Sequence, residues 1–350
     1  MPTGTYDIND LLAVRFQSAA EFGLDTIRQT LEADIAAHNA IVMQMVSELC
    51  EVTTDRQRIY GTSAGGEMVE VDEYGRSQTQ APVTGASVAF PLKLFQYALG
   101  WTGKWMQTHT PADMAQKTLN AEKAHLRSIT RELKRSIYLS GNYSVSDFLV
   151  DKVTLAVKRF VNADSVDIPD GPNGEAFDGA THTHFDANAG LANSLLKALV
   201  DDVVEHGHGS MVKLAIARGN ETAVRALTDF EAYPDPRLVF RNTDAPGQTA
   251  NVSRLDNRAI GIFNAAEVWV KPWAIAGFAF CWDAGASEKP LCFRQRESDS
   301  LQGLRVAAEL DAYPLMAQYM EAEYGIGVWN RTNGAILDFV NGSYTDPTIT

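Results

Sequence analysis

The stretch TPADMAQKTLNAEKAHLRSITRELKRSIYLSG, residues 110–141, carries the clearest structural signals of this sequence. It opens on Thr-Pro-Ala-Asp, which supplies an N-cap residue, a proline at the first helical position and an acid three residues after the cap. No further proline follows before Gly141, a residue typical of helix ends. The stretch therefore predicts one long helix over 111–139, about 42 Å in length.

The charge of this helix differs from that of the rest of the chain. Residues 109–141 contain six basic and three acidic side chains, whereas the whole chain has 30 basic and 44 acidic residues and a net charge of −14. A chain this acidic does not bind nucleic acid over its whole surface, because neutralising phosphates requires a surplus of Lys and Arg. The basic face of this helix is either simply solvated or paired with acidic neighbours. Its apolar face consists of Leu119, Leu126, Ile129, Leu133 and Ile137.

Length and composition indicate a globular protein. The 350 residues are 45% hydrophobic and 21% charged, which suffices for two or three cores. The three cysteines have no zinc-binding spacing and indicate a reducing compartment. Residues 1–10 lack the features of a secretory signal, and the longest apolar run, 272–282, is about half of what a bilayer crossing needs. We expect a soluble chain, cytoplasmic at synthesis, with no membrane partner.

The first fifty residues predict a further helix. Apolar residues recur from Leu24 to Leu49 at spacings of three, four and seven, which gives a single apolar stripe. His38 occupies a position on that stripe where an apolar residue is expected. A helix with one stripe is not stable alone, so it lies either against its own domain or against a neighbouring subunit.

Residues 52–108 have the pattern of a long β-hairpin. Residues 68–75 alternate like a strand that runs into a turn, and residues 87–95 also have an extended pattern. The polar, glycine-rich connection between the two arms has too few large apolar side chains to fold back on a core. We expect it to project from the body and to contact a partner.

The remainder of the chain mixes strands and helices without regular alternation, which indicates the α+β class. Residues 162–190, rich in Asp, Gly, Asn and Pro, predict a long loop. The expected helices are 193–205, 221–227 and 315–323. The expected strands are 153–161, 211–217, 238–241, 259–263, 267–270, 274–282, 291–296, 304–310 and a closing strand from 327 into 336–339.

Two glycine-rich motifs overlap at residues 61–66. Gly61-Thr-Ser-Ala-Gly65 matches the G-x-S-x-G pattern of serine hydrolases, in which a strand leads into a tight turn and then a helix. The residues that follow alternate like a strand instead, which disfavours a serine hydrolase. The same glycines have the spacing of a phosphate-binding loop, but Glu67 replaces the required lysine and would repel phosphate.

A histidine-rich segment suggests a metal site. His182, His184, Asp186, His206 and His208 lie within 27 residues, and three such ligands around zinc would leave a position open to activate water. The first part resembles the H-x-H-x-D-H motif of metallo-β-lactamase-type hydrolases, except that alanine replaces the last histidine. A metal-dependent hydrolase is therefore one hypothesis, and a polar surface loop without a metal is the other.

An aromatic cluster in the C-terminal half permits another hypothesis, a binding protein with an aromatic pocket. Large aromatic residues dominate protein cores and subunit contacts, so a core is the favoured interpretation. The cluster consists of Phe263, Trp269, Trp273, Phe278, Phe280 and Trp282.

The order of the segments resembles that of tailed-bacteriophage major capsid proteins of the Hong Kong ninety-seven type. An N-terminal arm, a projecting hairpin, a long proline-capped helix, a loop-rich mixed domain and returning strands follow one another along nearly the whole chain. The passages that carry the resemblance are 90–99, 113–141, Leu214-Ala-Ile-Ala217 with the helix after it, and Tyr324-Gly-Ile-Gly-Val-Trp-Asn-Arg331.

The resemblance implies a phage capsid fold with four parts. These are an N-terminal arm at 1–51, an extended β-hairpin loop at 52–108, a peripheral domain at 109–190 and 290–350 with spine helix 111–139, and an axial domain at 191–289.

The resemblance also implies a structural function without catalytic, cofactor-binding or metal-binding residues. Such a protein self-assembles as hexamers and pentamers into an icosahedral shell, in the host cytoplasm, and becomes part of the virion. The implied partners are further copies of the chain and scaffolding, portal and decoration proteins, and the shell encloses double-stranded DNA without sequence-specific binding. A cellular encapsulating compartment of the same fold is a related alternative.

Overall fold

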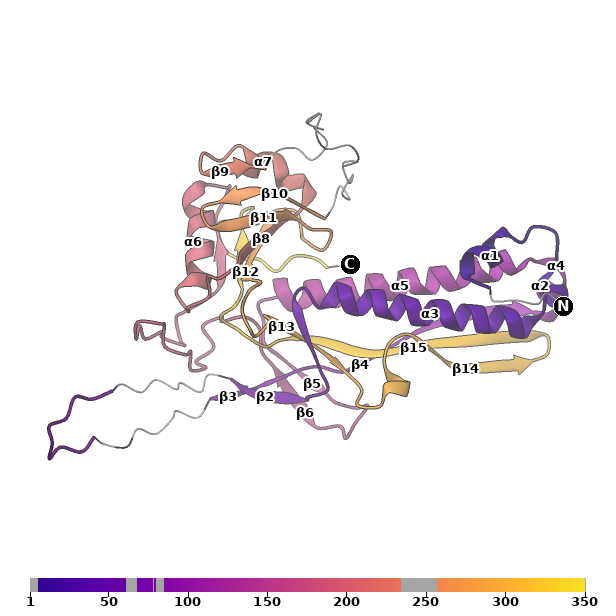
Figure 1. The fold of residues 1–350 in the computed structure, drawn as a ribbon, viewed down its shortest axis with the longest axis horizontal. Helices are drawn as coiled ribbons and strands as arrows, with labels where there is room; N and C mark the ends of the chain where they lie inside the picture. The colour runs from indigo at the N-terminus through magenta and orange to yellow at the C-terminus, as the bar shows by residue number, and fades with distance from the viewer. Residues whose placement is uncertain (1–5, 61–67, 78, 80–84, 234–256, 350) are drawn as a thin grey trace.

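The computed structural model of the chain describes residues 6–60, 68–77, 79, 85–233 and 257–349. Figure 1 shows an elongated body of long helices and strands, a second body of shorter strands and helices, and a projecting arm. Helices and mixed sheets occur together, as the predicted α+β class requires. None of the described helices has the length and apolar character that a membrane crossing needs.

The long helix α5, Pro111–Tyr138, confirms the helix predicted from the Thr-Pro-Ala-Asp signal. Its capping box forms, since the backbone N–H of Thr110 donates to the Asp113 carboxylate over 3.0 Å. The helix ends before Gly141, because Leu139 already has extended backbone angles. Three short helices contribute to an apolar cluster at its first turns: α1 (Ile8–Ala13), α2 (Ala19–Phe22) and α4 (Gly103–Thr108).

The N-terminal helix α3, Leu24–Val46, lies along α5 in Figure 1. Most of its apolar stripe is buried, with Ile35 and Val42 in the same core as the apolar face of α5. His38, at the unexpected polar position of the stripe, is buried as well, and its Nε2 lies 3.0 Å from Nδ1 of His125 on α5. The stripe therefore packs within its own subunit, which decides between the two possibilities that the sequence leaves open.

A five-stranded sheet forms the rest of the elongated body. Its longest strand, β15 (Leu315–Val328), pairs with β4 (Lys93–Thr102) on one side and with β14 and β13 on the other. The helix predicted at 315–323 is therefore wrong. That segment is rich in the helix formers Leu, Met, Ala, Gln and Glu, but pairing with two neighbouring strands overrides this local preference. The remaining strands are β1 (Cys50–Thr53, parallel to β13), β13 (Leu291–Gln295) and β14 (Arg305–Ala312).

A seven-stranded sheet with the order β7-β16-β12-β8-β11-β10-β9 forms the second body. The helix predicted at 193–205 is present as α6, Asn193–Val204, and packs against β12 and β16. The predicted strand 238–241 lies outside the described residues. The elements are β7 (Phe185–Ala187), β8 (Val212–Ile216), α7 (Glu221–Arg225), β9 (Phe230–Ala232), β10 (Arg258–Phe263), β11 (Ala266–Val270), β12 (Phe278–Asp283) and β16 (Ala335–Asp338).

Two antiparallel ribbons complete the fold: β2 (Gln57–Tyr60) with β3 (Ala86–Ala89), and β5 (Tyr143–Ser146) with β6 (Thr154–Val157). The strand predicted at 68–75 is wrong. This segment contains a turn, in which the N–H of Gly75 donates to the carbonyl oxygen of Asp72 over 3.0 Å. An alternating pattern makes a strand only where another strand accepts its backbone hydrogen bonds, and no strand pairs with 68–75 among the described residues.

Candidate functional site

The arm that projects from the body in Figure 1 is anchored at its base by aromatic packing. Tyr60, at the end of β2, and Phe90, just after β3, both pack edge-on against Trp329, with ring centroids 6.2 Å apart in each pair. The Arg58 guanidinium lies 5.1 Å from the centroid of the same Trp329 ring and forms hydrogen bonds with the Glu51 carboxylate. The base of the arm is therefore packed into the body.

A buried ion pair fixes the same base to β13. Nη2 of Arg294 lies 2.8 Å from Oδ2 of Asp147, and the two side chains are 4% and 0% exposed. Nη1 of Arg294 donates to the carbonyl oxygen of Phe90 over 2.9 Å. Buried charges are tolerated when they are paired and hydrogen-bonded. This contact therefore ties together β13, the chain after β3 and the β5–β6 connection.

Beyond its base, the described part of the arm is not buried by its own chain. Each of residues 68–77 is exposed, and Met68 and Tyr74 are almost entirely so. Exposed apolar side chains that lie close together mark surfaces that contact other molecules. The large apolar or aromatic residues of this segment are Met68, Val69, Val71 and Tyr74.

The chain exposes a large surface for its mass. Its accessible surface is 18933 Å², whereas a compact monomer of 38.3 kDa exposes about 14,000 Å². The difference of about a third belongs to the chain as a whole, and the exposed residues 68–77 contribute to it. Much of this additional surface is available for contacts with other molecules.

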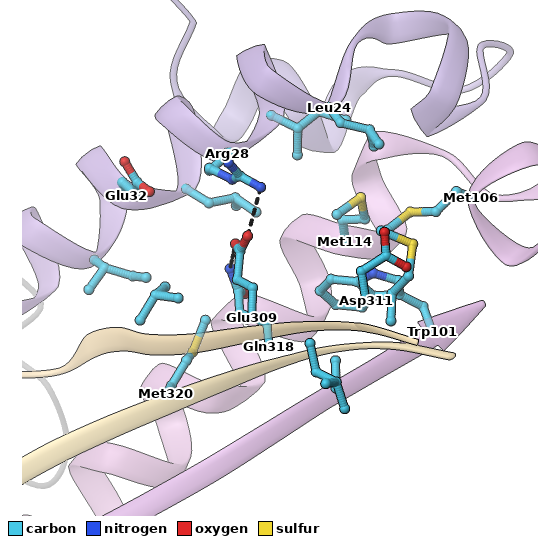
Figure 2. Close-up of a pocket in the computed structure, with 17 residues that line it drawn as sticks. Leu24, Arg28, Glu32, Trp101, Met106, Met114, Glu309, Asp311, Gln318 and Met320 are labelled. Carbon is cyan, nitrogen blue, oxygen red and sulfur yellow. Dashed lines mark hydrogen bonds and ion pairs between the residues drawn. The ribbon is translucent and has the colours of Figure 1, made fainter. Parts of the chain in front are cut away.

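A cavity of about 350 Å³ lies between α3 and the β14–β15 hairpin, as Figure 2 shows. Trp101, Met106 and Met114 line its apolar end. Arg28 reaches across it from α3 to Glu309 on β14, with 2.8 Å between Nη2 and Oε2. The two side chains are 51% and 43% exposed, so this ion pair is solvated and contributes little to holding the hairpin against α3.

Three residues of the predicted metal site converge in the structure. The Nε2 atoms of His182, His184 and His206 form a triangle with sides of 3.0, 3.0 and 3.1 Å. His182 and His184 lie two residues apart in the chain that enters β7, while His206 follows the end of α6. Glu205 completes the group, since its Oε1 lies 3.3 Å from Nε2 of His182 and 3.6 Å from Nε2 of His206. One donor atom from each residue lies within 4.8 Å of all the others.

Burial favours the neutral form of these imidazoles. It lowers the pKa of His206 to about 3, with His182 adding to the effect, and it lowers the pKa values of His182 and His184 as well. Nδ1 of His184 lies 2.7 Å from the carbonyl oxygen of Gly334. A carbonyl oxygen only accepts, so Nδ1 carries the proton and Nε2 presents a lone pair to the cluster. Neutral imidazole with a lone pair on one nitrogen is the form that binds metal ions.

Asp186 and His208, the other two residues of the predicted set, lie outside this cluster. Nε2 of His208 is 3.1 Å from Oγ1 of Thr332. The Asp186 carboxyl interacts instead with Asp202, whose pKa is raised to about 9 by burial and by Asp186. Glu205 was not part of the predicted set, and its position directly before His-Gly-His was the only signal that the sequence offered.

The aromatic cluster forms core rather than a pocket. Trp269 is partly exposed, and the Lys271 ammonium lies 4.3 Å from the centroid of its ring. The glycine-rich motifs at 61–66 lie outside the described residues. The buried members of the cluster are Phe263, Trp273, Phe278, Phe280 and Trp282.

A second group of titratable side chains is buried between α3 and α5. Glu122 is 8% exposed, and burial together with the Asp34 carboxyl raises its pKa to about 8. Nδ1 of His38 lies 3.9 Å from Oε2 of Glu122. Burial, with the neighbouring His38, lowers the pKa of His125 to about 4. Glu122 is therefore largely protonated at neutral pH, and the contact between the two helices depends on pH.

The sequence matches no protein-family model and no curated protein. Among solved structures, one from Mycobacterium phage Patience aligns over 99% of this chain and 96% of its own, with a TM-score of 0.69 and 18% identity. The capsid of a native GTA particle aligns over 85% of this chain and 90% of its own, with a TM-score of 0.48 and 15% identity. The SrpI encapsulin of Synechococcus elongatus aligns over 85% of this chain and 87% of its own, with a TM-score of 0.43 and 10% identity. The first likeness establishes the fold: over nearly its whole length, the chain shares the fold of this phage structure.

Proposed function

We propose that this chain is a major capsid protein, a non-catalytic subunit that self-assembles into the icosahedral shell around a phage genome. The observation that carries the proposal is the match of its fold, over 99% of the chain, to a structure from a phage. The virion is then its final location, and the host cytoplasm the place of assembly.

The surface of the subunit supports this role. Burying apolar surface contributes about 25 cal/mol per Å², so a subunit with about a third more surface than a compact monomer can form several interfaces of ordinary size. The exposed residues 68–77 lie away from the body in Figure 1, where a neighbouring subunit can cover them. Many modest contacts of this kind add up to a durable shell.

We further propose the division of the chain that the sequence suggests. The N-terminal arm is 1–51 and the extended loop 52–108, with β1 and β4 at their ends joining the five-stranded sheet. The axial domain, 191–289, contains most strands of the seven-stranded sheet. The peripheral domain is 109–190 with 290–350.

The proposed partners are copies of the same chain in hexamers and pentamers, together with scaffolding, portal and decoration proteins. The shell encloses double-stranded DNA without reading its sequence. The net charge of −14 supports this, because a net acidic subunit disfavours non-specific binding of DNA phosphates.

Shortening the arm tests the proposal. Tyr60 and Ala86 are paired in the β2–β3 ribbon, so replacing residues 61–85 with Asn-Gly gives a two-residue hairpin that closes the ribbon. We expect this variant to fold, because every described residue of 68–77 is exposed, but not to assemble. Size-exclusion chromatography and negative-stain microscopy would show shells or capsomers for the natural chain and monomers for the variant.

A matched control separates the length of the arm from its side chains. The variant Met68→Ser, Val69→Ser, Val71→Ser keeps the length and removes apolar contacts, so it should assemble less completely than the natural chain and more than the shortened variant. A natural chain that stays monomeric at high concentration would refute the proposed function. Normal shells from the shortened variant would refute the role of the arm.

A further inference from the structure

The histidine cluster has the spacing of a metal coordination sphere. Zinc binds imidazole nitrogens at about 2.0–2.1 Å in a tetrahedron, which places neighbouring donors about 3.3 Å apart. The Nε2 atoms of His182, His184 and His206 are 3.0–3.1 Å apart, so a point about 2.0 Å from all three lies about 1 Å outside their plane. Oε1 of Glu205, at 3.3 and 3.6 Å from two of these nitrogens, can occupy the fourth corner.

Hydrogen bonds among the three imidazoles cannot account for this arrangement. Nε2 of His184 carries no proton, because Nδ1 of that ring donates to Gly334. The Nε2 atoms of His182 and His206 then each carry either a proton or a lone pair. Whichever of these Nε2 atoms carry a proton, at least one of the three contacts, all about 3 Å long, cannot be a hydrogen bond. It brings together either two lone pairs or two N–H groups. A cation that accepts a lone pair from each nitrogen removes this conflict.

The surroundings also favour a cation. The hydrogen bond from His184 to the Gly334 carbonyl is the outer-shell contact that typically fixes the orientation of a metal-binding imidazole. Glu205 is the C-cap of the 12-residue helix α6, and His206 follows it. The carbonyl groups at a helix C-terminus carry partial negative charge, which attracts a positive ion.

We propose that His182, His184, Glu205 and His206 bind one structural Zn²⁺. Four protein donors fill a tetrahedral site and leave no position for a reacting water, which separates this role from that of a hydrolase. The ion would connect the chain that enters β7 to the end of α6. Because Gly334 immediately precedes β16, the same contact also reaches the second strand of the seven-stranded sheet.

The test is to measure zinc in the purified full-length chain and to titrate the metal-free chain with Zn²⁺. We expect one zinc per chain by elemental analysis, and a fall in melting temperature when a chelator removes it. The variant His182→Ala changes a ligand whose side chain is only partly buried, and Glu205→Gln preserves shape. Each should weaken zinc binding by more than the 10- to 100-fold that losing an outer-shell contact causes. Replacing zinc by Co²⁺ should give the intense visible absorption of a tetrahedral site.

His208→Ala is the matched control, because His208 lies two residues from His206 and contacts Thr332 instead of the cluster. It should retain one zinc per chain with unchanged affinity. The proposal is overturned if the natural chain neither contains zinc nor binds it in the titration. It is also overturned if His208→Ala loses zinc as readily as His182→Ala. Neither result affects the shell function, which assembly measures independently.

Discussion

Removing one partner of the buried Asp147–Arg294 ion pair should destabilise this subunit more than removing one partner of an equally short pair at its surface. Substituting Asp147→Asn preserves the size of the side chain and removes its charge. Arg294, 4% exposed, would then keep its hydrogen bond to the Phe90 carbonyl but lose its counter-ion.

The size of the effect follows from burial. Removing one partner of a buried pair costs about 3–5 kcal/mol, because the remaining charge stays away from water without compensation. Asparagine can still accept a hydrogen bond from Arg294, so we expect a loss near the lower end, about 3 kcal/mol. The double variant Asp147→Leu, Arg294→Met should recover most of this loss, since no isolated charge then remains buried.

Urea unfolding of unassembled subunits, followed by circular dichroism, measures these differences. The matched control is Glu309→Gln, which removes the charge from the Arg28–Glu309 pair of Figure 2. That pair has the same 2.8 Å separation but is solvated, so the control should lose less than about 1 kcal/mol. Equal losses for the two single variants would refute the argument from burial, and so would a double variant as unstable as Asp147→Asn.

Two further predictions concern α5 and β15. Folding raises the pKa of Glu122 from 4.5 to about 8. Between these two pH values the folded chain therefore binds more protons than the unfolded chain, so the contribution of Glu122 to stability falls as the pH rises toward 8. Glu122→Gln should remove this pH dependence. Between pH 6.5 and pH 9, a range in which folded His125 stays neutral, the natural chain should lose about 1–3 kcal/mol of unfolding free energy more than the variant. Identical pH profiles of the two chains in urea unfolding would contradict this. Gly325→Ala would bring a Cβ into a clash with the Pro91 carbonyl oxygen and should lower the free energy of unfolding by about 2–3 kcal/mol. The control Gly141→Ala, whose Cβ would have no atom within 4 Å, should change the melting temperature little. Similar decreases in melting temperature for the two variants would show that the contact at β15 relaxes freely.

Elements with local signals could be predicted from the sequence. Helix α5 has a capping box, a proline at its first position and an apolar face within one stretch of chain, and α6 is amphipathic over its whole length. The order of such elements was sufficient to suggest a phage-type fold, which the likeness to the mycobacteriophage structure supports. These signals act between neighbouring residues, so one sequence contains them.

Features that depend on distant residues could not be predicted in the same way. Strand β15 has the composition of a helix, and its partner β4 lies more than 200 residues earlier in the chain. Glu205 belongs to the histidine cluster only because the end of α6 meets the chain that enters β7. The burial of His38 depends on His125, which lies 87 positions away.

The narrow ribbon at the base of the arm has a mechanical consequence. Only four residue pairs join β2 to β3, and the ribbon is packed against the body up to Tyr60, so the described part of the arm is anchored at this one place. A slight rotation there displaces the far end by a distance that grows with its separation from that place. Neighbours set at different angles around a curved surface can thus be reached by a small change where the arm leaves its base, while the cores of both sheets keep their shape.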